Sequence, residues 1–297
     1  MNIEQEITHR AASIEERIHP YMPTEPGLQQ TVIDAMDYSV FAGGKRLRPM
    51  LMEASYRMFG GTEDTVEPFM AAIEMIHTYS LVHDDLPAMD NDEYRRGKKT
   101  THAKYGEAMA ILAGDALLNR AYETVAQAML AHPEDSRLMR AFAILAEKAG
   151  IYGMVGGQTV DVESEKKGQE IGREKLDFIY RLKTGALLEA SLVIGAVLAG
   201  ASEEEAGRME QAGTKLGLAF QIKDDILDVT STMEVLGKPI GSDTRNEKST
   251  YVTFEGLEQA QKDVKALSEE AVSILDGVSG EHDFLRELFL YLIGREK

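Results

Sequence analysis

Long stretches of helix-favouring residues, separated by short breaks, are the feature that most restricts how this chain folds. Ala, Leu, Glu and Met are abundant, and runs that alternate apolar with polar residues, as strands do, are few. Each break contains Gly, Pro or clustered charges that suit a turn. We therefore predict an all-α fold with helices near residues 28–42, 46–59, 64–86, 106–130, 136–152, 174–199, 203–231, 257–276 and 281–293.

The breaks are short, and none has the character of an interdomain linker. The chain has 297 residues, of which 43% are hydrophobic, and this suffices for a sizeable core. Apolar residues occupy more than one face of segment 106–130, as expected of a helix surrounded by other helices. We predict a single domain over residues 1–297, built as a multi-helix bundle.

The charge balance restricts the possible partners. A formal net charge of -18 argues against nucleic acid or an anionic membrane surface as the main partner, because both would be repelled. Any anion that the chain binds must therefore meet a local basic site.

The most lipid-like run, residues 190–201, is shorter than the roughly 20 residues that span a bilayer. We expect a buried helix there and no stable membrane insertion.

The chain contains no cysteine, which excludes a disulfide, a thiolate nucleophile and Cys-ligated zinc. This composition suits a reducing compartment. The first residues alternate charges and lack the apolar core of a signal peptide. We expect a cytoplasmic location.

Two apolar helical runs each end in paired aspartates, EMIHTYSLVHDDLPAMD with Asp84 and KLGLAFQIKDDILD with Asp224. We expect two helices of opposite halves of the bundle to present these acids towards a shared cavity. Asp224 and Asp228 are four apart and share a helix face, where like charges need a cation between them. Carboxylate oxygens without His or Cys suit Mg²⁺. For this cluster alone, a solvated acidic turn is the alternative.

The first cluster has a different spacing. Asp84 and Asp90 are six apart, which leaves them on different faces of an ideal helix. Pro87 lies between them, and a proline removes a helical hydrogen bond and crowds the preceding turn. We predict a broken or bulged helix that swings Asp90 back towards Asp84.

Basic residues adjoin these acids. Arg95 and Arg96 follow the first cluster, and GGKRLRP offers Lys45, Arg46 and Arg48 beside glycines. Arginine forms bidentate bonds to phosphate oxygens, so a metal and these cations together suit a bound diphosphate. A basic helix start is the alternative for GGKRLRP. The segment lacks the residue order of a P-loop, which argues against a nucleotide triphosphatase of that type.

Eight motifs follow one another over roughly residues 40–255: GGKRLRP, MIHTYSLVHDDLPAMDNDEYRRGK, AILAGDALL, GMVGGQ, KTGALLE, FQIKDDILD, GKPIGSD and NEKSTY. In order and spacing they resemble a known family, the short-chain isoprenyl diphosphate synthases, and look most similar to bacterial farnesyl diphosphate synthases. The resemblance implies the isoprenoid synthase fold around a deep central cavity, and a homodimer.

The reaction that the resemblance implies is head-to-tail condensation of dimethylallyl or geranyl diphosphate with isopentenyl diphosphate to (2E,6E)-farnesyl diphosphate. About three Mg²⁺ ions would hold the allylic diphosphate. Their implied ligands are Asp84, Asp85, Asp90, Asp224 and Asp228. The residues implied to help bind the allylic diphosphate are Arg95, Lys183, Thr184, Gln221, Lys238 and Lys248. The implied site for isopentenyl diphosphate comprises Gly44, Lys45, Arg48, His77 and Arg96.

The chemistry agrees with this arrangement. Ionising the allylic C–O bond leaves a carbocation and a pyrophosphate whose developing charge metal and cations stabilise. The double bond of isopentenyl diphosphate attacks the cation, so no protein nucleophile is needed. Dipoles near Lys183, Thr184 and Gln221 would steady the cation in a dry cavity. For the individual residues, the alternatives are that Lys183 and Thr184 are an ordinary solvated pair and that His77 is a core histidine with its hydrogen bonds satisfied.

Product length is expected to depend on the helix that precedes Asp84. Tyr79 lies five residues earlier, about 7 to 8 Å along the helix. In bacterial farnesyl synthases an aromatic here, with a two-residue insertion like Pro87-Ala88, resembles a floor that stops growth at C15. Ser80 lies closer than Tyr79 to the helix face of Asp84, so either Tyr79 reaches the cavity by the length of its side chain or another helix builds part of the floor. Tyr79 and Ser80 are the residues assigned to product length.

Other functions remain open at this stage. The alternatives within the family are a geranylgeranyl (C20) or geranyl (C10) diphosphate synthase. A terpene cyclase or diphosphate hydrolase on the same fold needs no isopentenyl diphosphate site, and Lys45, Arg48 and Arg96 argue against it. A non-catalytic subunit would tend to lose aspartates from the two motifs, and here both are complete.

Overall fold

The structure, a computed structural model, describes residues 2–167, 172–230 and 250–294, and the side chains of residues 165–167 are left out. The described residues are almost entirely helical, which confirms the all-α prediction. Their contacts form two compact units, Met1–Glu53 with Thr62–Phe142 and Ala54–Gly61 with Ala143–Lys297. The single domain remains a prediction.

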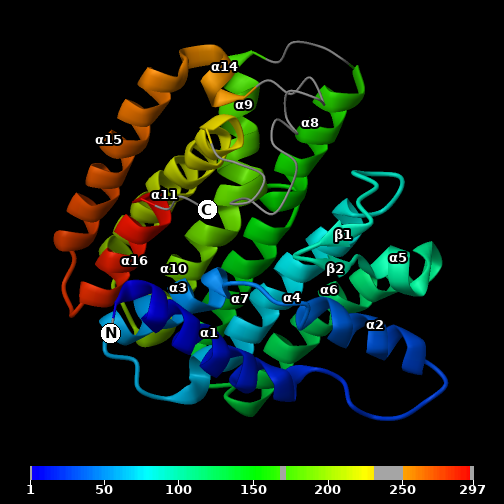
Figure 1. Cartoon of the computed structure of the whole chain (residues 1–297). Helices are drawn as coiled ribbons and strands as arrows, with labels where there is room; N and C mark the ends of the chain where they lie inside the picture. Colours follow the sequence, from blue (N-terminus) through cyan, green and yellow to red (C-terminus); the bar gives the residue numbers. More distant parts are fainter. Residues whose placement is uncertain (1, 168–171, 231–249, 295–297) are drawn as a thin grey trace. The chain divides into compact units, whose positions relative to one another are not determined.

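The first unit contains the elements from α1 to α6 that Figure 1 labels. Two helices, α3 (Leu47–Met58) and α7 (Ser136–Ala149), supply residues to both units. The other elements of the first unit are α1 (Ile3–Ile18), α2 (Gln30–Val40), α4 (Glu67–Asp84), β1 (Tyr94–Arg95), β2 (Lys98–Lys99), α5 (Thr101–Tyr105), α6 (Glu107–Ala131) and the 3-10 turns His19–Tyr21 and Asp64–Val66.

Helix α4 is the core helix of the first unit. It packs along α6 and also touches α1 and α2. Its residues from Phe69 to Ile76 are all buried, so its sequence shows no clean polar face. The helix carries the first aspartate pair at its C-terminal end, and the packing of α6 fixes where that end lies.

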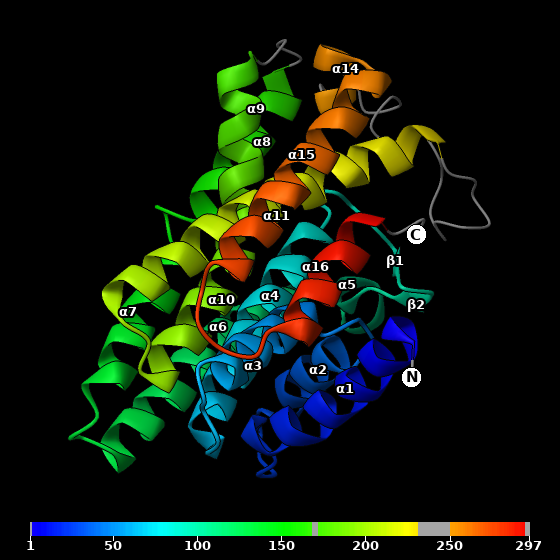
Figure 2. The same ribbon diagram turned by 90° about the vertical axis from the view of Figure 1, so that its left-hand side faces the viewer.

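The second unit is built around α10 (Ala186–Ala199) and α11 (Glu203–Thr230), which pack side by side. Figure 2 shows α15 running along α11. A π-helical turn, Tyr180–Gly185, precedes α10. The other helices of this unit are α8 (Met154–Lys167), α9 (Arg173–Ile179), α14 (Tyr251–Glu255), α15 (Leu257–Asp276) and α16 (Asp283–Gly294).

Residues 173–199 are apolar and long enough to cross a membrane by length and composition, but 78% of their apolar window is buried inside the structure. This is the pattern of a core helix. The apolar run 190–201 therefore lies mainly in a buried helix, as the sequence predicted.

Several short or polar elements were not predicted. Helix α1 is rich in charge, yet Ile7, Ile14 and Ile18 recur on one buried face and Asn2 forms a capping box with Gln5. The hairpin β1–β2 pairs Tyr94 with Lys99, where the sequence indicated only a break. The remaining unpredicted helices are α5, α8 and α14. Their apolar faces are short, so periodicity alone does not identify them.

Candidate active site

The first aspartate-rich motif lies where α4 ends. The helix stops at Asp84, three residues before Pro87, and Asp85 caps it. The chain then folds back, so that the amide of Asp90 donates to the carbonyl of Asp84 at 2.8 Å and that of Asp92 to Asp85 at 3.2 Å. The predicted break is confirmed, and it brings the backbone of Asp90 beside that of Asp84.

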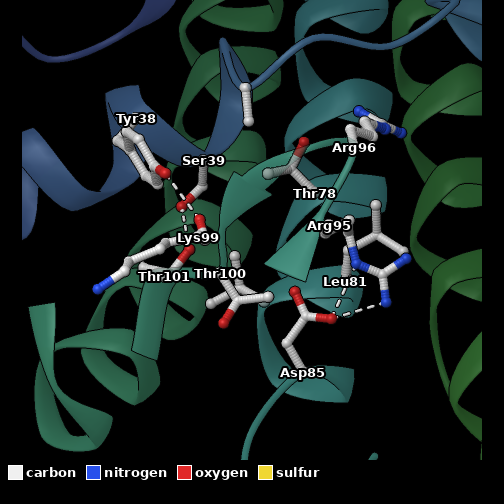
Figure 3. Close-up of a pocket in the computed structure, with 12 residues that line it drawn as sticks. Tyr38, Ser39, Thr78, Leu81, Asp85, Arg95, Arg96, Lys99, Thr100 and Thr101 are labelled. Carbon is white, nitrogen blue, oxygen red and sulfur yellow. Dashed lines mark hydrogen bonds and ion pairs between the residues drawn. The ribbon is translucent and has the colours of Figure 1, made fainter. Parts of the chain in front are cut away.

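Asp85 is bound to Arg95 rather than open to solvent. Its side chain is buried, and Arg95 donates from Nε at 2.8 Å and from Nη2 at 2.7 Å to the same oxygen, Oδ1 (Figure 3). Burial raises the pKa of Asp85, and the bond to Arg95 opposes that rise. For Arg95 burial lowers the pKa, but Asp85 outweighs it and the net pKa is raised. In this structure Asp85 positions an arginine.

A small cavity of about 40 Å³ lies beside this pair and is lined by residues of α2, α4 and the hairpin. It has room for a few waters only. Tyr38 donates to the carbonyl of Lys99 at 2.7 Å, and Ser39 and Thr101 share a hydrogen bond of 2.8 Å, which ties the hairpin region to α2 (Figure 3). These contacts help to orient the hairpin, which includes Arg95 and Arg96.

The GGKRLRP segment makes a left-handed bend held by Arg46. This residue has φ 49° and is buried, and its guanidinium donates to Glu74 at 2.6 Å, to Glu15 at 2.9 Å and to the carbonyl of Val40 at 2.7 Å. Such a paired, buried arginine is an anchor for its neighbours. Arg46 therefore fixes the backbone from which Lys45 and Arg48 extend.

The predicted isopentenyl diphosphate residues gather in the first unit. Arg96 Nη1 donates to the carbonyl of Gly43, and a Cβ at Gly44 would come within 2.5 Å of that same nitrogen. Gly44 has φ +142°, so both its conformation and the packing of Arg96 favour glycine. The segment 43–48 and the hairpin thus meet, although they lie far apart in sequence.

Arg48, Arg96 and His77 form a group with excess positive charge. Burial, offset by Glu74 and deepened by Arg96, lowers the pKa of Arg48 to about 10. Loss of hydration where the Arg96 guanidinium meets the protein also lowers its pKa, although the residue as a whole is exposed. The pKa of His77 falls well below its usual value because of burial and the neighbouring arginines, chiefly Arg48. Cations whose charge is disfavoured in this way gain most from a bound anion.

The second motif lies inside α11. Asp224 and Asp228 are one helical turn apart, as predicted, and Asp228 is buried. Between them in sequence, Asp225 is buried and accepts hydrogen bonds from the hydroxyl of Tyr180 and, at 2.7 Å, from the amide of Tyr251. The second aspartate of the pair is again tied to protein donors.

The π-helical turn carries Lys183 and Thr184. Lys183 Nζ forms an ion pair with Asp161 of α8 at 2.5 Å, and Thr184 Oγ1 donates to Gln221 of α11 at 2.8 Å. A Cβ at Gly157 would collide with the backbone of Lys183, so α8 needs glycine to approach this turn. Lys183 and Thr184 therefore each have a protein partner while remaining partly exposed. Sequence reasoning missed Asp161, which stands three residues after the GMVGGQ motif's Gln158.

The predicted product-length residues belong to α4. Tyr79 is buried, its ring meets that of His83 edge-on at 5.8 Å, and burial raises its pKa to about 12 with smaller effects of Tyr122 and Asp84. Because Tyr122 is on α6, Tyr79 lies at the packing of α4 on α6. Ser80 Oγ donates to the carbonyl of His77 at 2.9 Å.

Two residues of the predicted allylic diphosphate site, Lys238 and Lys248, lie outside the described residues.

Whether the aspartates of the two motifs suit a metal ion depends on the donor atoms that they offer. Within residues 2–167, 172–230 and 250–294, no group of three or more His, Asp or Glu side chains is arranged to hold a metal ion. Mg²⁺ commonly takes one or two protein carboxylates and completes its shell with water and phosphate oxygens. Asp84 with Asp90, and Asp224 with Asp228, fit this mode of binding.

Comparisons with known proteins find relatives over most of the chain. The family profile described as Polyprenyl synthetase matches residues 29–279. A geranylgeranyl diphosphate synthase of Cyanophora paradoxa is 47% identical over 88% of this chain and 86% of its own length. A dimethylallyltranstransferase of Fischerella ambigua is 48% identical over 82% of this chain and 70% of its own. The crystal structure of an FPP/GFPP synthase from Zymomonas mobilis has a TM-score of 0.87 and 32% identity, and covers 98% of this chain and 99% of that one.

Proposed function

Because this chain belongs to the polyprenyl synthetase family, and is therefore a prenyltransferase, we propose that it condenses dimethylallyl or geranyl diphosphate with isopentenyl diphosphate to a C15 or C20 product. Members of the family use isopentenyl diphosphate and an allylic diphosphate, and generally depend on a divalent metal. The choice of starter and the length of the product belong to the proposal.

The observation that carries the proposal is the group formed by Arg48, Arg96 and His77 beside the glycine turn. The pKa of each arginine is lowered chiefly by burial, and neighbouring arginines lower it further while Glu74 opposes the shift. A diphosphate supplies the missing negative charge, and arginine binds it with directed hydrogen bonds. We assign isopentenyl diphosphate to these residues, with Lys45 and Gly44. A diphosphate hydrolase or a cyclase has no use for this second anion site.

We assign the allylic diphosphate to Lys183, Thr184, Gln221 and Arg95, with Lys238 and Lys248. Asp161 and Gln221 hold Lys183 and Thr184 in place before substrate arrives, so little reorganisation is needed on binding. Mg²⁺, about three ions by resemblance, would be held by Asp84, Asp90, Asp224 and Asp228 and would stabilise the charge on the departing pyrophosphate. Asp85 contributes by orienting Arg95.

The reaction itself needs no group of the protein as a nucleophile. Breaking the allylic C–O bond gives a delocalised carbocation and pyrophosphate. The double bond of isopentenyl diphosphate then forms the new C–C bond, and a proton leaves to the pyrophosphate. Thr184 and Gln221 present oxygen dipoles that favour a nearby cation, and apolar walls would keep water from it.

Purified protein with Mg²⁺, isopentenyl diphosphate and dimethylallyl or geranyl diphosphate tests the proposal. We expect condensation products by liquid chromatography and mass spectrometry, and their loss when EDTA is added. Arg96→Gln should raise the KM for isopentenyl diphosphate by about tenfold or more, the size expected of a charged hydrogen bond, and should spare the allylic KM. Release of pyrophosphate from the allylic substrate alone, with no C–C bond formed, would overturn the proposal.

Two observations favour different product lengths. The relatives from Cyanophora paradoxa and Catharanthus roseus are named geranylgeranyl synthases, which favours the C20 product, the alternative of the sequence analysis. Tyr79 favours C15, because a buried aromatic five residues before Asp84 matches the floor attributed to bacterial farnesyl synthases.

The product of the wild-type protein with each starter decides between these lengths. If Tyr79 is the floor, the wild type ends at C15, and Tyr79→Ala extends the product to C20 or beyond. Tyr122→Phe, which keeps a ring at the neighbouring position on α6, is the matched control and should leave the product unchanged. A C20 product from the wild type would settle the choice for geranylgeranyl diphosphate.

The homodimer and the cytoplasmic location are also proposals. Helix α6 exposes Ile111 and Leu112, each with nearly half of its surface open in this structure, and apolar residues of this kind suit a contact with a second copy. Sedimentation equilibrium of the wild type against Leu112→Glu tests the dimer. A monomeric wild type would overturn it.

A further inference from the structure

One face of α11 is matched residue by residue to the π-helical turn. Gly217, Gln221 and Asp225 recur at four-residue intervals and so share a helix face. Gly217 packs against the backbone of Gly185, Gln221 accepts from Thr184 at 2.8 Å, and Asp225 accepts from Tyr180. As the residue number rises along α11, the number of its partner in the turn falls from 185 to 184 to 180. The two segments therefore run antiparallel.

Asp224 and Asp228 point from a different part of the same helix. At 100° per residue they lie about 60° to 100° around the axis from Asp225. The motif DDILD is thus divided, with one face directed to the π-helical turn and an adjacent face that carries the two carboxylates assigned to metal.

The carboxylate of Asp225 also reaches a third element. Its Oδ2 accepts the amide of Tyr251 at 2.7 Å, and that amide lies 3.2 Å from the hydroxyl of Tyr180. Tyr251 is the first residue of α14, and all three residues are buried. In a buried setting such a shared, charge-assisted contact is strong and hard to replace.

A π-helical turn is rare and needs its surroundings to maintain it. Here the turn begins at Tyr180 and contains Lys183 and Thr184, the residues assigned to the allylic diphosphate. Asp225 accepts the hydroxyl of Tyr180 and so fixes the first residue of the turn. The position of Tyr180 in turn affects where Lys183 and Thr184 lie.

We propose that Asp225 is a positioning residue, which joins α11 to the π-helical turn through Tyr180 and to α14 through the amide of Tyr251, and so sets Lys183 and Thr184 relative to Asp224 and Asp228. The inference rests on the proposed function in assigning those four residues to the allylic diphosphate and its metal. The contact itself stands independently of the reaction.

Tyr180→Phe is the decisive variant, because it removes one hydroxyl and leaves every carboxylate intact. We expect the KM for the allylic diphosphate to rise about tenfold, as for loss of a hydrogen bond to a charged group. The KM for isopentenyl diphosphate and the Mg²⁺ concentration for half-maximal rate should change by less than about twofold. Asp225→Asn should show the same pattern, and the double variant should add little to either single change.

Tyr251→Phe is the matched control. It removes the hydroxyl that donates to Asp263 at 2.9 Å but keeps the amide that donates to Asp225. Its allylic KM should stay close to that of the wild type. An unchanged allylic KM in Tyr180→Phe, together with a lost response to Mg²⁺ in Asp225→Asn, would identify Asp225 as a metal ligand and overturn the proposal.

Hydrogen–deuterium exchange separates this inference from the reaction. In the substrate-free protein, exchange at residues 180–185 and at the amide of Tyr251 should be at least about fivefold faster in both Tyr180→Phe and Asp225→Asn, because local opening becomes easier. Unchanged exchange overturns the contact as a positioning device. Faster exchange in a protein that forms no prenyl product overturns the proposed function alone.

Discussion

The two aspartate-rich motifs reach similar carboxylate sets through different backbones. The first begins at the last residue of α4 and continues into a turn, where the amide of Asp90 returns to the carbonyl of Asp84. The second is helical throughout, with Asp224 and Asp228 one turn apart. The comparison shows that a turn can bring the backbones of two acids six residues apart together, whereas a helix does so at a spacing of four.

The motifs are alike in one further respect. In each pair the second aspartate, Asp85 or Asp225, is buried and accepts hydrogen bonds from the protein. The donors differ, since Arg95 is a cation whereas Tyr180 and the amide of Tyr251 are neutral. Removing the carboxylate of Asp85 therefore leaves the charged Arg95 without this acceptor. Removing that of Asp225 leaves only the neutral hydroxyl of Tyr180 and the amide of Tyr251 without it.

The largest expected effect tests whether the leading aspartates are equivalent. Asp84→Asn and Asp224→Asn should each lower kcat by about 1000-fold, because each removes a carboxylate that stabilises charge in the transition state through metal. Steady-state kinetics at several Mg²⁺ concentrations measure this. Glu258→Gln, which changes an exposed acid of α15, is the control. A large loss in only one variant would break the equivalence.

The next effect concerns the charge that Asp85 neutralises. Asp85→Asn should lower the free energy of unfolding by about 2 kcal/mol, because Arg95 loses a charged acceptor in a half-buried position. Asp92→Asn is a matched control, since Asp92 lies 4.0 Å from the same guanidinium and is exposed. It should cost less than about 0.5 kcal/mol. Urea denaturation of both variants that gave equal losses would contradict the assignment.

A smaller effect follows from the arginines around His77. Its pKa is depressed in the folded protein, so below about pH 6.5 the unfolded chain binds a proton that the folded protein does not. Stability from this group is therefore present above pH 6.5 and lost as the pH falls, by up to about 1.4 kcal/mol per pH unit.

Urea titrations between pH 7.5 and 5.5 measure this slope. His77→Gln should flatten the slope, whereas His132→Gln, which changes an exposed side chain, should not. A wild-type slope that survives in His77→Gln would assign the pH dependence to other groups. Addition of pyrophosphate should reduce the slope, because a bound anion favours the protonated ring.

The smallest effect concerns Pro87. Because α4 ends before Pro87, Pro87→Ala should change the free energy of unfolding by no more than about 1 kcal/mol, mainly through the unfolded chain. In the second motif the same residue type is not tolerated, and Ile226→Pro should cost about 3 kcal/mol or more. Thermal melts of the two variants compare them directly. A large loss from Pro87→Ala would show that proline itself holds the turn.

Much of the fold followed from residue patterns. The long apolar segments of α4, α6 and α11 were predicted close to their observed limits, since length and composition favour helix there. The helix predicted over residues 174–199 is instead α9, the π-helical turn and α10 in succession. Elements with few apolar residues were missed, as α1 and the hairpin at Arg95 show. Their stability comes from packing against other elements, which periodicity within one segment does not reveal.

The sequence alone determined the helical class, the two acid motifs and the basic segments beside them, because spacing along a helix and side-chain chemistry are local properties. Only the tertiary structure decided which acids bind other groups of the protein, as Asp85 and Asp225 do, and which cations are placed together where an anion can bind. Asp85 and Asp84 are identical in chemistry and adjacent in sequence. Arg95, brought from the hairpin, pairs with Asp85, and burial stabilises this pairing because an unpaired charge is costly away from water.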